Sequence, residues 1–297
     1  MARSHLKKFE HEINPNCSVH LRGKLLYNQK SKYQNIEIVE IPHLGKCLLL
    51  DGVLQLSLSD EFIYHESIVH PALLAHPNPK KIVVIGGGDG GTLRELLKYP
   101  IEQIYLIELD KAVVDASKEY LPEIGASSFK DPRVKIIYGD GRKWLEQSSE
   151  LFDIIIIDLT DPHGPSTLLF TKEFYEIVNK HLTSKGIMIS DCDGYEFGGI
   201  FLNIIKTAGT IFSYVYPFQS YVSCYFSTIG FMICSNNNLD FMKNDLLVEK
   251  KIQDTKLNLR YYNASELASL FIKTKFLDTL LQKEWEISSD KKPLETE

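Results

Sequence analysis

Several features that would mark a membrane, secreted or metal-binding protein are missing from this sequence. No apolar run approaches the about 18 to 20 residues that a helix needs to cross a bilayer, and residues 1–16 lack the apolar core of a secretory signal. The cysteines are scattered and form no Cys-x-x-Cys pair, so we expect free thiols, no disulfide framework and no metal site. They are Cys17, Cys47, Cys192, Cys224 and Cys234. These absences favour a cytoplasmic protein.

An excess of basic charge is missing as well. Lysine and arginine together number 33 against 39 aspartates and glutamates, which gives a formal net charge of −6. This balance weighs against a nucleic-acid partner and is compatible with a cationic ligand. The length of 297 residues is long for one compact domain and short for three. We therefore expect one main α/β domain with a smaller domain beside it.

The first part of the chain, residues 1–75, is predicted to be a small β-rich domain. From residue 17 onward, short alternating or apolar stretches are broken at Gly45-Lys46 and Asp51-Gly52, which are hairpin signals. The stretch 60–76 then predicts a helix that begins at Asp60 as its N-cap. Its apolar face is expected to consist of Ile63, Ser67, Val69, Leu73 and Leu74.

Residues 76–297 are predicted to form a catalytic domain in which strands alternate with helices. Apolar strands are expected within 81–88, 103–110, 134–141, 152–162, 186–191 and 230–235, and helices at 92–99, 112–121 and 170–182. The unbroken run Ile154–Ile157 is typical of a parallel strand that is covered on both faces. The pattern predicts a doubly wound sheet of the Rossmann-like, class I methyltransferase type, with ligands at the carboxyl ends of its strands. The polar tail after residue 285 is expected to fray.

A glycine-rich loop follows the first of these strands and opens a helix. The run Gly86–Gly91 would let the backbone approach a ligand closely, as it does in nicotinamide enzymes, flavoproteins and methyltransferases alike. Asp89 narrows this choice, because a carboxylate facing a pyrophosphate or a ligand carboxylate would be repulsive. The loop suits a ligand that ends in a bare ammonium, as decarboxylated S-adenosylmethionine does.

Acidic residues also end the next three strands. Glu108 lies about twenty residues past the loop, where a carboxylate accepts hydrogen bonds from ribose hydroxyls, and Asp140-Gly141 could receive an adenine amino group. Asp158 follows four isoleucines, and with Asp161 it could hold an alkylammonium and take its proton. The alternative for Asp161 is an ordinary Asp-Pro turn.

Taken together, these segments resemble the spermidine synthase family of aminopropyltransferases. The sequence carries YQNIEI, LLLDGVLQ, DEFIYHE, VIGGGDGGTLRE, IELD, GDGRKW, DLTDPHGP, LFTKEFYE and LRYYN in the order of that family, over most of residues 30–265. The resemblance implies transfer of the aminopropyl group of decarboxylated S-adenosylmethionine to a small amine, with putrescine first and cadaverine, agmatine or spermidine as alternatives. It also implies a homodimer or homotetramer, and a donor that is a co-substrate, with no separate cofactor.

The resemblance further implies a role for each matching residue. The donor contacts would be Gln34 and Pro165 for the nucleoside and thioether, Glu108 for the ribose, Asp140 with Gly141 for the adenine, and Asp89 for the amine of the aminopropyl arm. The proton acceptor would be Asp158, and the amine-acceptor pocket would include Gln55, Tyr64, His65, Asp161 and either Tyr225 or Tyr221.

The sequence departs from the family pattern where the acceptor would bind. SCYFSTIGF replaces the usual Thr-Tyr-Pro-Ser-Gly segment, Thr167 replaces a glutamate, and Asp191-Cys192-Asp193 replaces Gln-x-Glu. An amine N-methyltransferase, a nicotinamide-dependent oxidoreductase and a non-catalytic polyamine-binding protein are the rival interpretations. Asp89 argues against the first two, and the intact set of Asp89, Asp158 and Tyr64 argues against the third.

Overall fold

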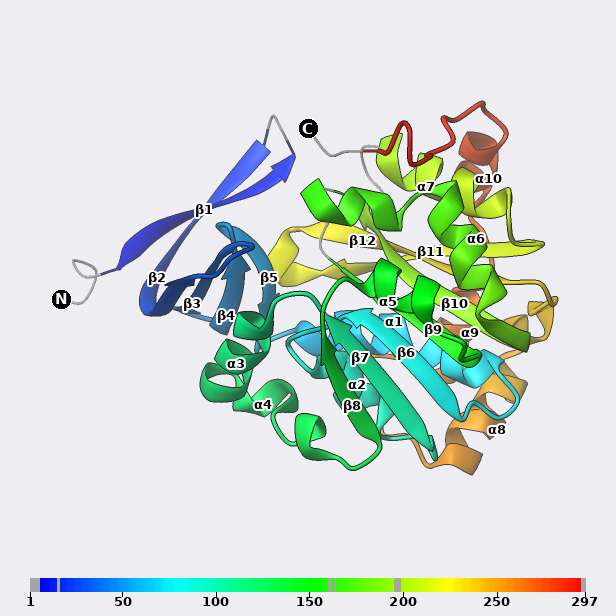
Figure 1. Cartoon of the computed structure of the whole chain (residues 1–297), viewed down its shortest axis with the longest axis horizontal. Helices are drawn as coiled ribbons and strands as arrows, with labels where there is room; N and C mark the ends of the chain where they lie inside the picture. Colours follow the sequence, from blue (N-terminus) through cyan, green and yellow to red (C-terminus); the bar gives the residue numbers. More distant parts are fainter. Residues whose placement is uncertain (1–5, 15–16, 160–161, 163, 195–198, 295–297) are drawn as a thin grey trace.

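The computed structural model describes residues 6–14, 17–159, 162, 164–194 and 199–294. Two sheets lie side by side, the smaller one blue in Figure 1 and the larger one running from cyan to yellow. The smaller sheet is antiparallel, in the order β1 (Lys7–Asn14), β2 (Cys17–Lys30), β3 (Asn35–Ile41), β4 (Gly45–Leu50) and β5 (Val53–Ser57). The β-rich N-terminal region is therefore confirmed, and β1 is a strand that the sequence did not reveal.

The hairpin turns of this sheet follow the glycine signals with one shift. Asp51 and Gly52 both have positive φ, 49° and 86°, and connect β4 to β5 as expected. The preceding turn lies earlier than predicted, because His43 with φ 72° and Gly45 with φ 75° make the reversal. Lys46 is already paired with Glu40 across the hairpin.

The larger sheet has seven strands in the order β11-β12-β10-β9-β6-β7-β8. These are β6 (Lys81–Gly86), β7 (Gln103–Glu108), β8 (Val134–Tyr138), β9 (Phe152–Asp158), β10 (Leu182–Gly194), β11 (Tyr214–Val222) and β12 (Ser227–Ser235). Strands β8, β7, β6, β9 and β10 are parallel, and β12 pairs antiparallel with both β10 and β11. The sheet is methyltransferase-like, as predicted, although β11 was missed.

Helices and 3-10 turns connect and cover these strands. They are α1 (Glu61–Ala75), α2 (Gly91–Leu96), α3 (Lys111–Tyr120), α4 (Pro122–Gly125), η1 (Ser128–Lys130), α5 (Gly141–Gln147), η2 (Gly164–Leu169), α6 (Lys172–Lys180), α7 (Gly199–Gly209), η3 (Ser223–Tyr225), η4 (Asp240–Lys243), α8 (Asp245–Thr255), α9 (Ala264–Ser269) and α10 (Lys275–Leu281). No helix of the described segments is long and apolar enough to span a membrane.

The core covers both faces of the larger sheet. In β9, Ile154 and Ile156 join one apolar cluster, whereas Ile155 and Ile157 join another, and all four are fully buried. Such alternation is what a central parallel strand requires. The prediction for the isoleucine run is confirmed, and it places the end of β9 at Asp158, inside the molecule.

Helix α1 differs from the prediction of a single apolar face. Every residue of the helix except Phe62 is buried, because α1 packs against α2, α8 and strands β9 to β12. Asp60 occupies the N-cap position, but its carboxylate accepts hydrogen bonds from Ser57 Oγ (2.7 Å) and the Cys224 amide (2.8 Å) and none from the helix. Helix α1 was assigned to the N-terminal domain, but it packs on the larger sheet. The domain boundary at residue 75 stays a prediction.

The prediction of a frayed tail is wrong for the described part of that segment. Asp290 forms a bidentate ion pair with Arg142 (2.6 and 2.7 Å), and its Oδ1 also accepts a hydrogen bond from Thr171. Leu294 is buried against the apolar cluster on one face of the sheet. The polar composition of this segment hid these contacts, because its partners lie more than one hundred residues earlier in the chain.

Candidate active site

The glycine loop between β6 and α2 is pressed against the end of β9. A Cβ atom added at Gly86, where φ is 86°, would lie 1.9 Å from the carbonyl oxygen of Asp158. The Gly87 amide donates to the same oxygen at 3.0 Å, and a Cβ at Gly87 would lie 2.8 Å from Asp158 Oδ2. These glycines are therefore required for contact between two neighbouring strand ends, in addition to any approach to a ligand.

Three acidic side chains converge at these strand ends, and we call Asp89, Glu108 and Asp158 the acid edge. A Cβ at Gly88 would lie 2.8 Å from Glu108 Oε2, so the loop passes between Glu108 and Asp158. Burial, together with the charges of Asp110, Asp158 and Asp89, raises the pKa of Glu108 to about 7, despite a 2.8 Å hydrogen bond from the Asp110 amide. The structure thus brings together three of the acids that sequence reasoning placed at the strand ends.

Asp158 is held by two hydroxyl groups. Tyr64 Oη lies 2.8 Å from Asp158 Oδ1, and Thr92 Oγ1 donates to Asp158 Oδ2 at 2.5 Å. Burial and the charge of Asp89 raise the pKa of Asp158, although His65, Thr92 and Tyr64 act in the opposite direction. A buried carboxylate with a raised pKa is a better proton acceptor than an ordinary aspartate.

Sequence reasoning missed two neighbours of this group. Thr92 is the second residue of α2, and a threonine next to the glycine loop gave no signal beyond its place in the motif. Asp191 had been noted only as a departure from the family pattern, yet its Oδ2 lies 3.1 Å from the Tyr64 hydroxyl. Tyr64 therefore connects the end of β9 with Asp191 of β10.

The close polar contacts of His65 are with Glu61 and Asp89, neither of which was assigned to the acceptor pocket. Its Nδ1 lies 2.7 Å from Glu61 Oε2 and its Nε2 lies 3.0 Å from Asp89 Oδ1. Burial disfavours the charged ring, but Asp89 and Glu61 overcome this effect and raise the pKa of His65 to about 10. The predicted acceptor-pocket residue is in contact with the predicted donor-arm residue.

The donor-side candidates fall at or near the acid edge. Gln34 Nε2 donates to Asp110 Oδ2 at 3.2 Å, and the Asp110 amide in turn contacts Glu108. Asp140 is half-exposed and is the N-cap of α5, where its Oδ1 accepts from the Lys143 amide at 3.1 Å. A Cβ at Gly141 would lie 2.4 Å from Ile85 Cγ2. Glycine at 141 is thus needed for packing against the end of β6.

Of the remaining acceptor-side candidates, Gln55, Tyr221 and Tyr225 lie among the described residues. The Tyr225 hydroxyl donates to the backbone carbonyl of Gln55, so these two candidates are in contact. The Gln55 side chain donates to the carbonyl of Val53 at 3.2 Å. Tyr221 is 52% exposed on β11, so Tyr225 is the residue that reaches this region. Asp161 lies outside the described residues. The side chain of Pro165, in η2, does as well.

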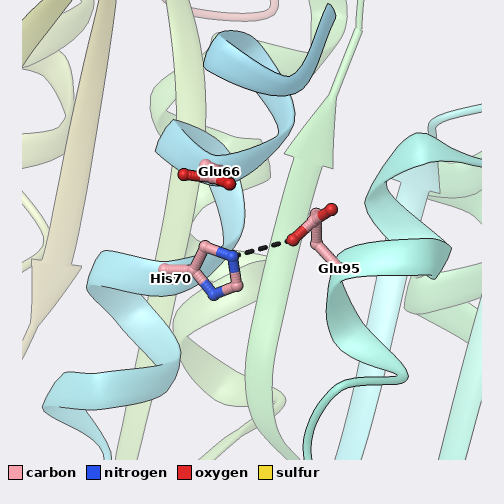
Figure 2. Close-up of side chains that lie close together, drawn as sticks. All are labelled: Glu66, His70 and Glu95. Carbon is pink, nitrogen blue, oxygen red and sulfur yellow. Dashed lines mark hydrogen bonds and ion pairs between the residues drawn. The ribbon is translucent and has the colours of Figure 1, made fainter. Parts of the chain in front are cut away.

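A second buried polar cluster, shown in Figure 2, has the composition of a metal site. Glu66 and His70 of α1 face Glu95 of α2, with His70 Nε2 2.9 Å from Glu95 Oε2. Every one of these groups already has protein partners. Glu66 accepts from the backbone amides of residues 260–262, His70 Nδ1 lies 2.8 Å from Tyr99 Oη, and Glu95 pairs with Arg94 and Lys98. The cluster is therefore a closed hydrogen-bond network that fixes the LRYYN segment to α1.

The fold and the acid edge define the class of the protein as a methyltransferase-like transferase. Comparison with known proteins narrows this class. Residues 61–244 match the spermine/spermidine synthase domain, and residues 9–57 match the spermidine synthase tetramerisation domain. The chain belongs to the spermine/spermidine synthase family, and it is an enzyme of the transferase class.

Individual relatives agree over nearly the whole chain. A polyamine aminopropyltransferase of Korarchaeum cryptofilum is 35% identical over 98% of this chain and 92% of its own. One of Thermococcus kodakarensis is 39% identical over 86% of this chain and 90% of its own. A crystal structure of a spermidine synthase in complex with the transition state analogue AdoDATO has a TM-score of 0.88 and 30% identity, covering 95% of this chain and 97% of that one.

Proposed function

We propose that this enzyme transfers the aminopropyl group of decarboxylated S-adenosylmethionine to a small di- or polyamine, with putrescine as the first candidate. The observation that carries the proposal is Asp89, a carboxylate in the glycine loop where a donor's chain would end. His65 and the Gly91 amide lower the pKa of Asp89 although burial opposes this. An ionised carboxylate at this point favours a terminal ammonium and disfavours the carboxylate of full S-adenosylmethionine.

The proposed reaction is a direct displacement. The nitrogen of a neutral acceptor amine attacks the methylene carbon bound to the donor sulfonium. The new C–N bond forms as the C–S bond breaks, and the bonding pair returns to sulfur, which leaves as neutral methylthioadenosine. The nitrogen then carries a positive charge and an extra proton, which Asp158 accepts. Because the sulfonium is itself the activated leaving group, we propose that the reaction uses no separate cofactor.

The acid edge favours the transition state over the bound neutral amine. Positive charge moves from sulfur to nitrogen during attack, and Asp158 lies where Tyr64 and Thr92 hold it in one orientation. Glu108 would accept hydrogen bonds from the ribose hydroxyls, and Asp140 with Gly141 would border the adenine. Gln34 and Pro165 would line the nucleoside, while Gln55, Tyr225 and Asp161 would border the acceptor.

The first test offers the enzyme both donors and a panel of amines, with products identified by mass. We expect turnover with decarboxylated S-adenosylmethionine and putrescine, giving spermidine, and none with the full donor. Methylated products, or comparable use of both donors, would contradict the proposal. Turnover with another amine in place of putrescine would correct the acceptor and keep the reaction type.

We also propose that the N-terminal sheet joins copies of this chain into a homo-oligomer. Support comes from the match of residues 9–57 to a tetramerisation domain. Light scattering at micromolar concentration is expected to show a dimer or tetramer. A single monomeric species would be inconsistent with this assembly.

A further inference from the structure

Four charged side chains form a row that runs from the partly exposed Arg94 through the buried Glu61 and His65 to Asp89 of the acid edge. Arg94 of α2 forms a bidentate pair with Glu61 (Nη1–Oε1 3.0 Å, Nη2–Oε2 2.8 Å). Glu61 Oε2 lies 2.7 Å from His65 Nδ1, and His65 Nε2 lies 3.0 Å from Asp89 Oδ1. Charges therefore alternate along the row, positive, negative, positive and negative. Each member is thereby paired with opposite charge on at least one side.

The central histidine is fixed in position and in charge. Its side chain is 2% exposed, and a Cβ added at Gly91 would lie 2.2 to 2.5 Å from its ring atoms, so only glycine there leaves room for the ring. Both ring nitrogens lie against carboxylate oxygens, and carboxylates only accept hydrogen bonds. Both nitrogens must therefore donate, which defines an imidazolium. The pKa of about 10 agrees with this geometry.

Other charged or titratable groups also lie around His65. Tyr64 meets the ring edge-on at a centroid distance of 5.4 Å, and Asp158 of β9 interacts with it through space. Arg260 lies 3.8 Å from Glu61 Oε1 and adds positive charge at the far end of the row. The nearest groups are Glu61 and Asp89, and they dominate because their distances are hydrogen-bond distances.

The contacts of Asp89 are one-sided. His65 Nε2 and the Gly91 amide both contact Oδ1, the latter at 2.7 Å, and no described residue donates a hydrogen bond to Oδ2. One oxygen is thus held by the protein while the other is left for a ligand. This arrangement fixes the direction of the carboxylate as well as its charge.

We propose that His65 is a positioning residue for the donor, which as an imidazolium anchored by Glu61 and Arg94 keeps Asp89 charged and its Oδ2 directed at the donor's terminal ammonium. This inference rests on the proposed function and refines it. It moves His65 from the acceptor pocket, where resemblance placed it, to the donor side. It also gives α1 and α2 a part in donor recognition, through residues that do not touch the donor.

The test is His65→Gln, with KM measured separately for donor and acceptor. Glutamine can still donate one hydrogen bond to Asp89 but carries no charge. We expect the donor KM to rise about 10- to 100-fold, the loss typical of a hydrogen bond to a charged group, and the acceptor KM to stay within about threefold. A rise confined to the acceptor KM would overturn the proposal.

The pH profile gives a second readout that a merely structural role would not move. In the wild type His65 lowers the pKa of Asp89, so donor binding persists into acid. Without the imidazolium, burial raises the pKa of Asp89, and Asp89 becomes neutral at a higher pH. The acid limb of kcat/KM for the donor is therefore expected to move toward alkaline pH in His65→Gln. An unchanged acid limb would overturn the proposal.

Two further variants serve as controls. His70→Gln removes another fully buried histidine of α1, one bonded to Glu95 and Tyr99, and is expected to lower thermal stability without changing the donor KM. Glu61→Gln keeps the imidazole but removes one of the two carboxylates that raise the pKa of His65. It is expected to raise the donor KM less than His65→Gln does. It carries the test if His65→Gln fails to fold, and a normal donor KM in Glu61→Gln would then overturn the proposal. If the wild type does not use the decarboxylated donor at all, the proposed function fails. If the wild type uses it and the donor KM of both variants is unchanged, only this inference is refuted.

Discussion

Asp158→Asn is expected to lower kcat by about 10²- to 10⁴-fold, the usual contribution of a general base. Asparagine has nearly the same shape and can still accept a hydrogen bond from Tyr64 through its oxygen, so the change removes basicity and negative charge more than geometry. Burial and the charge of Asp89 raise the pKa of the wild-type carboxyl, which makes it a better proton acceptor than an ordinary aspartate. Asparagine cannot accept the proton. The measurement is kcat at saturating donor and acceptor, with products quantified by mass.

Glu108→Gln is the matched control for this experiment. It removes a buried carboxylate from the same acid edge, and is expected to raise the donor KM by about 10- to 100-fold while kcat changes little. Melting curves must first show that both variants fold. Turnover by Asp158→Asn near the wild-type rate would mean that Asp158 is a structural residue at the end of β9 and that another group takes the proton.

Gly86→Ala is expected to lower kcat by about 10²-fold or more, because a displacement of catalytic groups by about 1 Å has an effect of that size. The added Cβ would lie 1.9 Å from the backbone oxygen of Asp158, and a backbone atom cannot move aside as a flexible side chain can. The loop, Asp158 or both must shift. Thermal melting and steady-state kinetics on the same preparation measure the two consequences together.

Gly52→Ala separates this clash from backbone strain. Gly52 has the same φ of 86°, but a Cβ there would meet nothing within 4 Å. It is expected to lose only the about 1 to 2 kcal/mol of a left-handed non-glycine residue and to keep its activity. Equal losses of activity in both variants would show that strain alone, and not contact with Asp158, accounts for the effect at Gly86.

Much of the larger sheet could be predicted because its central strands are apolar runs that end in a glycine or an acidic residue. The carboxyl ends of parallel strands meet at one edge, so Asp89, Glu108 and Asp158 could be grouped before any contact was known. Strands β1 and β11 were not predictable in the same way. Both pair antiparallel at the edge of a sheet, where alternating polar residues such as those of KKFEHEIN give a weak pattern.

The contacts within the site were harder to predict than the location of the site. Periodicity tells which side of a helix is apolar, but α1 is buried on every side and its sequence does not say which residue faces which partner. The pairing of His65 with Asp89 joins residues 24 positions apart on two elements, and that of Glu66 with the amides of 260–262 spans almost two hundred positions. Such contacts depend on packing and have no local signature.

The acid edge also has a thermodynamic consequence for the protein itself. A raised pKa means that the folded state binds a proton more tightly than the unfolded chain does. For Glu108, with a pKa of about 7 against an ordinary value of 4.5, this difference corresponds to about 3 kcal/mol of folding stability. That stability is present at pH values below 4.5, falls as the pH rises toward 7, and is absent above it. At neutral pH much of that stability is therefore lost, and a cationic ligand that binds the folded enzyme at the acid edge offsets part of the loss.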